Sequence, residues 1–147
     1  MLSKIKTQWI NLDGAAGNFQ GLLALPPAGK GPGIVLFQEI FGVNSHIQAV
    51  VEQYALNGFV VLAPDLFWRQ KKRIELGYEG DDRALGIDMM KKLVPAEIEA
   101  DVKTSVSALR ARPETAAKVG AIGYCLGGRL AYIAAAIADV NAAVAYY

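Results

Sequence analysis

The stretch KVGAIGYCLGGRLAY, residues 118–132, joins two patterns that mark different kinds of secondary structure. Its first part is a continuous apolar run, which is typical of a β-strand buried on both faces. An alanine-rich segment follows from Leu126 to Asp139 and predicts a helix. Glycines at 123, 127 and 128 surround Cys125 and predict a tight turn between the strand and the helix. This order of elements is the repeating unit of a parallel α/β sheet.

Helical patterns alternate with apolar runs over most of the chain. One helix is expected over 45–56, with Asn44 or Ser45 as its N-cap. The pattern over 82–92 is weakly helical, and a firmer helix is expected over 95–111, because a proline occupies its first turn and apolar residues recur at helical spacing.

The expected strands lie near residues 4–10, 19–25, 33–38, 59–63, 118–123 and 142–147. The first two predict an antiparallel hairpin whose turn holds Asp13, Gly14 and Gly17. We predict an α/β fold with a mostly parallel sheet covered on both faces. In such sheets chemistry collects at the carboxyl ends of the strands, which here carry Glu39 and Cys125.

The composition describes a folded chain of about one domain with little net charge. The 147 residues are 53% hydrophobic and 20% charged, and the formal net charge is +1. This balance excludes a disordered polar chain and gives no reason to expect nucleic acid or an anionic membrane as a partner. The basic run 71–73 is followed at once by acidic residues, as in a solvated loop.

Cysteine usage and the N-terminus indicate the compartment. A single cysteine rules out an internal disulfide framework and fits a reducing compartment. Residues 1–14 do not contain the apolar core of a signal peptide, and no apolar run approaches the ~20 residues that span a bilayer. We therefore expect a cytoplasmic protein.

The turn around Cys125 has the spacing of a nucleophile between two glycines, G-x-nucleophile-x-G. A sharp strand-to-helix turn lifts the thiol into the open and places the Leu126 N–H at a helix N-terminus, where it can bind a developing oxyanion. Two alternatives remain at this point: an inert buried thiol, or a phosphate-binding loop. The glycines do not fit G-x-G-x-x-G and no P-loop lysine follows, so we expect no nucleotide or metal cofactor.

Three stretches together resemble the dienelactone hydrolase family: QEIFGVNSHI at 38–47, GFVVLAPDLFWRQ at 58–70 and KVGAIGYCLGGRLAY at 118–132. The resemblance implies a three-layer α/β-hydrolase sandwich and the hydrolysis of a small ester or lactone. In a sandwich of this type, the strand ending at Glu39 should lie between those beginning at Phe59 and Lys118. It assigns Cys125 as the nucleophile and Glu39 as the carboxylate beside it, which interacts with the thiol before substrate binds. The backbone N–H groups of Ile40 and Leu126 become the oxyanion-hole donors.

Cysteine chemistry of this kind also needs a base and a group that orients it. The one histidine, His46, lies in the first turn of a predicted helix, where we expect packing rather than catalysis. Asp139 comes too early for the aspartate of the family and is expected to end a helix. By the resemblance, the chain is a single, incomplete domain over residues 1–147 that corresponds to the first three-fifths of an enzyme, with both partners expected beyond residue 147.

That expectation leaves the strand over 142–147 without a cover, so a C-terminal segment or a second chain is the expected partner there, besides the substrate. A non-catalytic half-domain that binds or assembles with another protein is the alternative function. The identity of the substrate stays open. The residue that binds the substrate carboxylate also stays open, because no motif aligns Arg73 or Arg83 with the arginine that has this role in the family. Trp68 and Tyr124 are candidates for lining the cleft.

Overall fold

The computed structural model describes residues 5–147, apart from the side chain of Ala117. Its elements, in chain order, are β1 (Lys6–Gly14), β2 (Gly17–Leu25), β3 (Gly31–Phe37), α1 (Ser45–Leu56), β4 (Val60–Pro64), α2 (Gly80–Lys91), α3 (Pro95–Arg110), β5 (Thr115–Tyr124), α4 (Leu126–Ile137) and β6 (Ala142–Tyr146). The strands form one sheet in the order β1-β2-β4-β3-β5-β6. β1 and β2 are antiparallel to their neighbours, and the other four strands are parallel to one another. β3 therefore lies between β4 and β5, as predicted.

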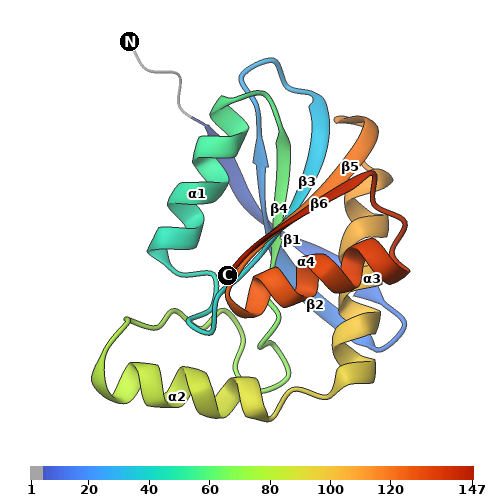
Figure 1. Cartoon of the computed structure of the whole chain (residues 1–147). Coiled ribbons are helices and arrows are strands. Elements are labelled where there is room, and N and C mark those ends of the chain that lie inside the picture. Colours follow the sequence, from blue (N-terminus) through green and yellow to red (C-terminus); the bar gives the residue numbers. More distant parts are fainter. Residues whose placement is uncertain (1–4) are drawn as a thin grey trace.

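Helices cover both faces of the sheet (Figure 1). On one face α1 buries Ile47 and Val51 against β2, β3 and β4. On the other face α3 and α4 bury a larger apolar cluster that includes Val102 and Leu130. Hydrophobic burial at roughly 25 cal/mol per Å² drives this layering. The predicted three-layer α/β arrangement is confirmed.

The hairpin differs from the prediction in where its strands end. The ladder continues to the pair Gly14 and Gly17, so the turn contains only two residues, 15 and 16. Asp13, Gly14 and Gly17, which were predicted in the turn, belong to the strands. The Trp68 ring lies so close to Gly17 that an added Cβ would be 2.5 Å from it, and the φ of +133° at Gly17 also favours glycine. The predicted start at residue 4 lies outside the described residues.

The helix boundaries agree with the capping residues in the sequence. Asn44 is the N-cap of α1, and its side chain accepts a hydrogen bond from the Ile47 N–H at 3.1 Å. α2 begins at Gly80, two residues earlier than predicted. α4 ends at Ile137, and Asp139 follows with a φ of 54°, so this residue belongs to the end of the helix as expected.

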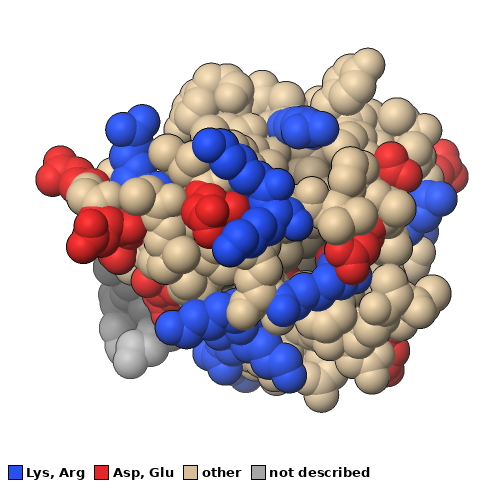
Figure 2. Space-filling view, turned by 90° about the horizontal axis from the view of Figure 1, so that it is seen from below, with Lys and Arg blue, Asp and Glu red and all other residues tan. Residues whose placement is uncertain are grey.

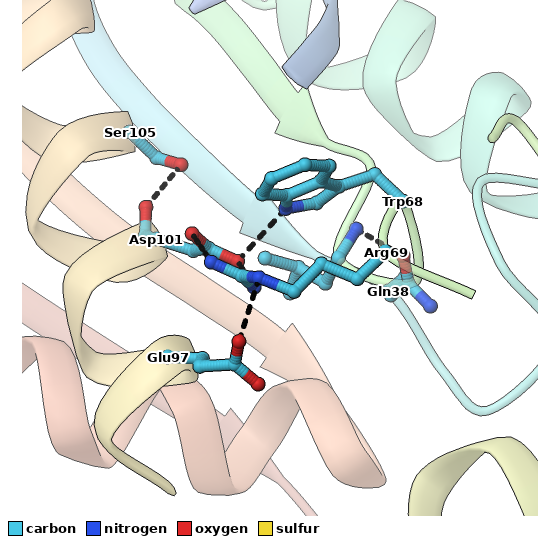
Figure 3. Close-up of polar contacts among 7 residues, drawn as sticks. Gln38, Trp68, Arg69, Glu97, Asp101 and Ser105 are labelled. Carbon is cyan, nitrogen blue, oxygen red and sulfur yellow. Dashed lines mark hydrogen bonds and ion pairs between the residues drawn. The ribbon is translucent and has the colours of Figure 1, made fainter. Parts of the chain in front are cut away.

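The irregular segment after β4 is fixed to α3 by a buried carboxylate (Figure 3). Asp101 accepts hydrogen bonds from the Trp68 indole N–H at 3.0 Å and from Arg69 at 2.7 and 3.1 Å. Arg69 also pairs with Glu97 at 3.0 Å. Asp101 is almost fully buried, and each of its oxygens accepts a hydrogen bond. The pair of Arg69 with Asp101 therefore holds the chain just beyond β4 in one position.

β6 forms one edge of the sheet and is exposed along its length, with Val144 at 45%. Among residues 5–147 no strand pairs with its outer side.

Figure 2 views the molecule from below, and Lys and Arg side chains on that face are interspersed with Asp and Glu. Within the same described range, every helix is too short or too polar to cross a bilayer.

Candidate active site

Cys125 occupies a strained turn between β5 and α4. Its φ is 57° and its ψ −114°, a backbone conformation that residues with a Cβ rarely adopt, and its thiol is exposed. A Cβ on Gly123 would overlap the backbone of Gly127, so only glycine fits at that position. The predicted elbow around Cys125 is therefore present, and it presents the sulfur to solvent.

The register of two parallel strands brings the carboxylate and the thiol to one edge. Phe37 of β3 pairs with Gly123 of β5, and Glu39 and Cys125 each lie two residues further on. Tyr147, which follows β6 and is largely exposed, lies near both groups: slight desolvation and the charges of Glu39 and Cys125 raise the pKa of its phenol. The strand ends that the sequence predicted to converge do so.

Leu126 and Ile40, the predicted oxyanion donors, lie in different local settings. Leu126 is the first residue of α4, so its N–H has no acceptor within the helix. Ile40 lies in a tight bend closed by a bridge between Glu39 and Gly42. α2 supports this bend, since a Cβ on Gly86 would lie 2.6 Å from the Ile40 carbonyl oxygen.

Glu39 is buried and anchored from two sides. The Tyr78 hydroxyl donates a hydrogen bond to its Oε1 at 2.9 Å. Its backbone carbonyl accepts a hydrogen bond from Gln38 Nε2 at 3.1 Å, while Gln38 Oε1 accepts from the Leu66 N–H at 3.0 Å. Gln38 thus joins the end of β3 to the chain leaving β4, and this contact fixes the backbone that carries Glu39.

Several of the other candidates named from the sequence lie beside an aromatic ring. His46 is exposed on the first turn of α1, with its ring 6.4 Å from that of Tyr78. The Arg73 guanidinium lies 4.1 Å from the Trp9 ring on β1, and Trp68 stacks on Phe19 at 5.5 Å. Tyr124 stacks on Tyr146 at 5.0 Å, beside the elbow. Trp68 and Arg73 are therefore committed to packing near the hairpin.

A small apolar cavity adjoins the start of α4. Its volume is about 130 Å³, and it is lined mainly by side chains of α2, α3 and α4, among them Met90, Ile98, Leu126 and Leu130. Arg129 brings a positive charge to its rim.

Three residues that hold the site were not assigned from the sequence. Gln38 begins the stretch 38–47, but the sequence does not indicate that its amide is buried. Asn44 was recognised only as a helix cap. Tyr78 lies in the irregular stretch between β4 and α2, and no periodicity there indicates that it reaches Glu39.

Comparison with known proteins shows similarity in both sequence and fold. The model of the dienelactone hydrolase family matches residues 19–147. A carboxymethylenebutenolidase of Pseudomonas sp. is 37% identical over 96% of this chain and 60% of its own length, and one of Pseudomonas putida is 36% identical over 96% and 61%. The solved structure m3DLH has a TM-score of 0.74 at 30% identity, over 89% of this chain and 54% of its own. The chain spans about three-fifths of the length of these curated relatives. By the extent of the family match, the chain belongs to the dienelactone hydrolase family.

Proposed function

We propose that this chain carries the nucleophile half of a hydrolase that cleaves a small ester or lactone through Cys125. The observation that carries the proposal is the strained, exposed elbow at Cys125, which lies at the sheet edge that also holds Glu39. Strain at such a position is maintained only where the surrounding structure fixes it, and it marks functional sites. The relatives named as carboxymethylenebutenolidases support a lactone as the substrate class.

The proposed reaction begins when the Cys125 sulfur attacks the substrate carbonyl as the thiolate. The thiol proton is released to a base, and the C–S bond forms as the carbonyl π electrons move to oxygen. The N–H groups of Leu126 and Ile40 stabilise this oxyanion. Collapse of the tetrahedral intermediate breaks the ester C–O bond, and the alkoxide leaves as an alcohol once it is protonated. Water then cleaves the thioester and regenerates the thiol.

The second half of this cycle needs a group that protonates the alkoxide and activates water. His46 is the one histidine of the 147 residues, and it lies on α1 rather than at the elbow. We propose that a C-terminal segment supplies the histidine and aspartate and also covers the exposed strand β6. The 147-residue chain alone should then be acylated once by an activated ester and stall.

The experiment compares single and repeated turnover of p-nitrophenyl acetate. The isolated chain should release about one equivalent of p-nitrophenolate, and a chimaera with the C-terminal two-fifths of the Pseudomonas sp. relative should turn over. Cys125→Ala should lower the rate of the chimaera at least ~100-fold, the scale of a lost covalent route. Sustained turnover by the isolated chain that disappears in His46→Ala would instead make His46 the base.

One observation favours the alternative of a non-catalytic half-domain. The whole of β6 is exposed, and an unpaired edge strand binds whatever strand is available. A chimaera that folds but does not hydrolyse esters, together with stable binding of a second chain at β6, would support this alternative. In either case we propose a cytoplasmic location, where the single thiol stays reduced.

A further inference from the structure

Tyr78 extends from the irregular segment between β4 and α2 to the carboxylate of Glu39. The Tyr78 hydroxyl lies 2.9 Å from Glu39 Oε1, and its ring packs edge-on against Phe41 at a centroid distance of 4.5 Å. The two residues are 39 positions apart in the chain. No step of the proposed reaction uses this contact, although it holds the Glu39 side chain at Oε1.

Asn44 fixes the direction of this hydrogen bond. Asn44 Oδ1 accepts from the Ile47 N–H at 3.1 Å, so the other end of the amide must be the NH₂ group. That group donates to the Leu76 carbonyl at 3.1 Å and to the Tyr78 oxygen at 3.3 Å. Since an NH₂ group can only donate, the Tyr78 oxygen accepts from Asn44 and its own hydrogen points to Glu39.

The phenol remains a donor over the working pH range. Burial, together with the hydrogen bond to Glu39 and the charge of that carboxylate, raises the pKa of Tyr78 against the opposing effect of Asn44. The ionisable groups around this pair are His46 on α1, Cys125 at the elbow and Tyr147 after β6. Tyr78 therefore anchors one oxygen of the Glu39 carboxylate by a hydrogen bond that it donates.

We propose that Tyr78 is a positioning residue that holds Glu39 where it acts on the Cys125 thiol. The inference rests on the proposed function, because it gives Glu39 the role of partner to the thiol. A carboxylate with one oxygen anchored loses rotamer freedom before substrate binds, so it stays beside the thiol for a larger fraction of the time. Without the hydroxyl, Glu39 keeps its charge and loses its fixed orientation.

The test measures the rate of alkylation by iodoacetamide against pH on the 147-residue chain, with intact mass as the readout. Cys125 is the only cysteine, so no other thiol contributes. An ionised carboxylate beside a thiol disfavours the thiolate, so Glu39→Gln should move the midpoint of the profile about one unit lower. Tyr78→Phe should move it in the same direction by about half as much, and should add nothing in the Glu39→Gln background, since both changes act through one group.

Tyr132→Phe is the matched control, because Tyr132 is 74% exposed on α4, and its profile should equal that of the parent. Thermal unfolding of Tyr78→Phe checks that the loss of the hydroxyl leaves the fold intact. A Tyr78→Phe profile that equals the parent while Glu39→Gln shifts would overturn the positioning role and leave the proposed function standing. So would an opposite shift, or one that adds in full to that of Glu39→Gln. An unshifted Glu39→Gln profile would remove Glu39 from the thiol, and the Tyr78 proposal would fall with that assignment.

Discussion

Gly127→Ala tests whether close contact between α4 and β3 builds the site. Gly127 lies in the first turn of α4, and a Cβ there would meet the backbone oxygens of Phe37 and Gln38, the latter at 2.6 Å. Ordinary contact begins at 3.4 Å, so the helix must move away from the end of β3 by about 0.8 Å or more. The obstructing atoms belong to a buried strand and cannot turn aside as a side chain would.

The expected cost has two parts. Overpacking costs about 1–3 kcal/mol, and the higher helix propensity of alanine returns at most about 1 kcal/mol of this. We therefore expect Gly127→Ala to lower the free energy of unfolding by about 2 kcal/mol. Movement of the start of α4 by nearly 1 Å relative to the end of β3 would separate the Leu126 N–H from the Ile40 N–H, and should also slow acylation of Cys125 about 100-fold.

Urea unfolding followed by circular dichroism and a p-nitrophenyl acetate burst provide the two measurements. Gly120→Ala in β5 is the matched control, because the nearest atom to its added Cβ is 3.4 Å away, so its stability should change by less than about 1 kcal/mol. If Gly127→Ala behaves like Gly120→Ala in both assays, the contact between α4 and β3 does not position the oxyanion donor and the reasoning is wrong.

Three other predictions follow from single contacts. Asp101→Asn leaves the partly buried Arg69 without its main partner, and urea unfolding should show a loss of about 2 kcal/mol, while a loss near zero would show that Glu97 suffices. Glu39→Gln should lower the pKa of Tyr78, because it removes the charge and weakens the hydrogen bond that raise it; NMR of ¹³C-labelled tyrosine checks this, and an unchanged Tyr78 resonance would contradict it. Burial raises the pKa of Asp65 in the folded chain, so ionisation of this carboxyl opposes folding. Its contribution to the free energy of unfolding should therefore fall as pH rises from about 3.8 through the raised pKa of the folded chain. Asp65→Asn should abolish that part of the pH dependence, and a difference between the two proteins that stays constant with pH would refute it.

The position of the elbow was predictable because it depends on short-range patterns, whereas the order of the parallel strands was an implication of the family resemblance. Apolar runs bounded by glycine mark buried strands, and the glycines on either side of Cys125 are required by the backbone packing at the start of α4. The alternation of strands and helices over 31–147 predicts a parallel sheet, but it does not fix the order of the strands within that sheet.

The contacts that hold Glu39 were not predictable for a physical reason. They join Glu39 and Asn44 to Tyr78, and the segment from Asp65 to Glu79 has no regular period that would fix its path. Its course depends instead on tertiary anchors such as the pair of Arg69 with Asp101. The hairpin ends were also missed, because a two-residue turn of alanines at 15 and 16 carries no glycine or asparagine signal of its own.

The central claim is that Cys125 is the nucleophile, and intact-mass analysis of the 147-residue chain after a short incubation with p-nitrophenyl acetate tests it most directly. The account predicts one added acetyl group, released by hydroxylamine and located by peptide mapping on the segment that contains Cys125. The same incubation should leave Cys125→Ala unmodified. An acetyl group on another residue of the parent, or an equal burst from Cys125→Ala, would contradict the account.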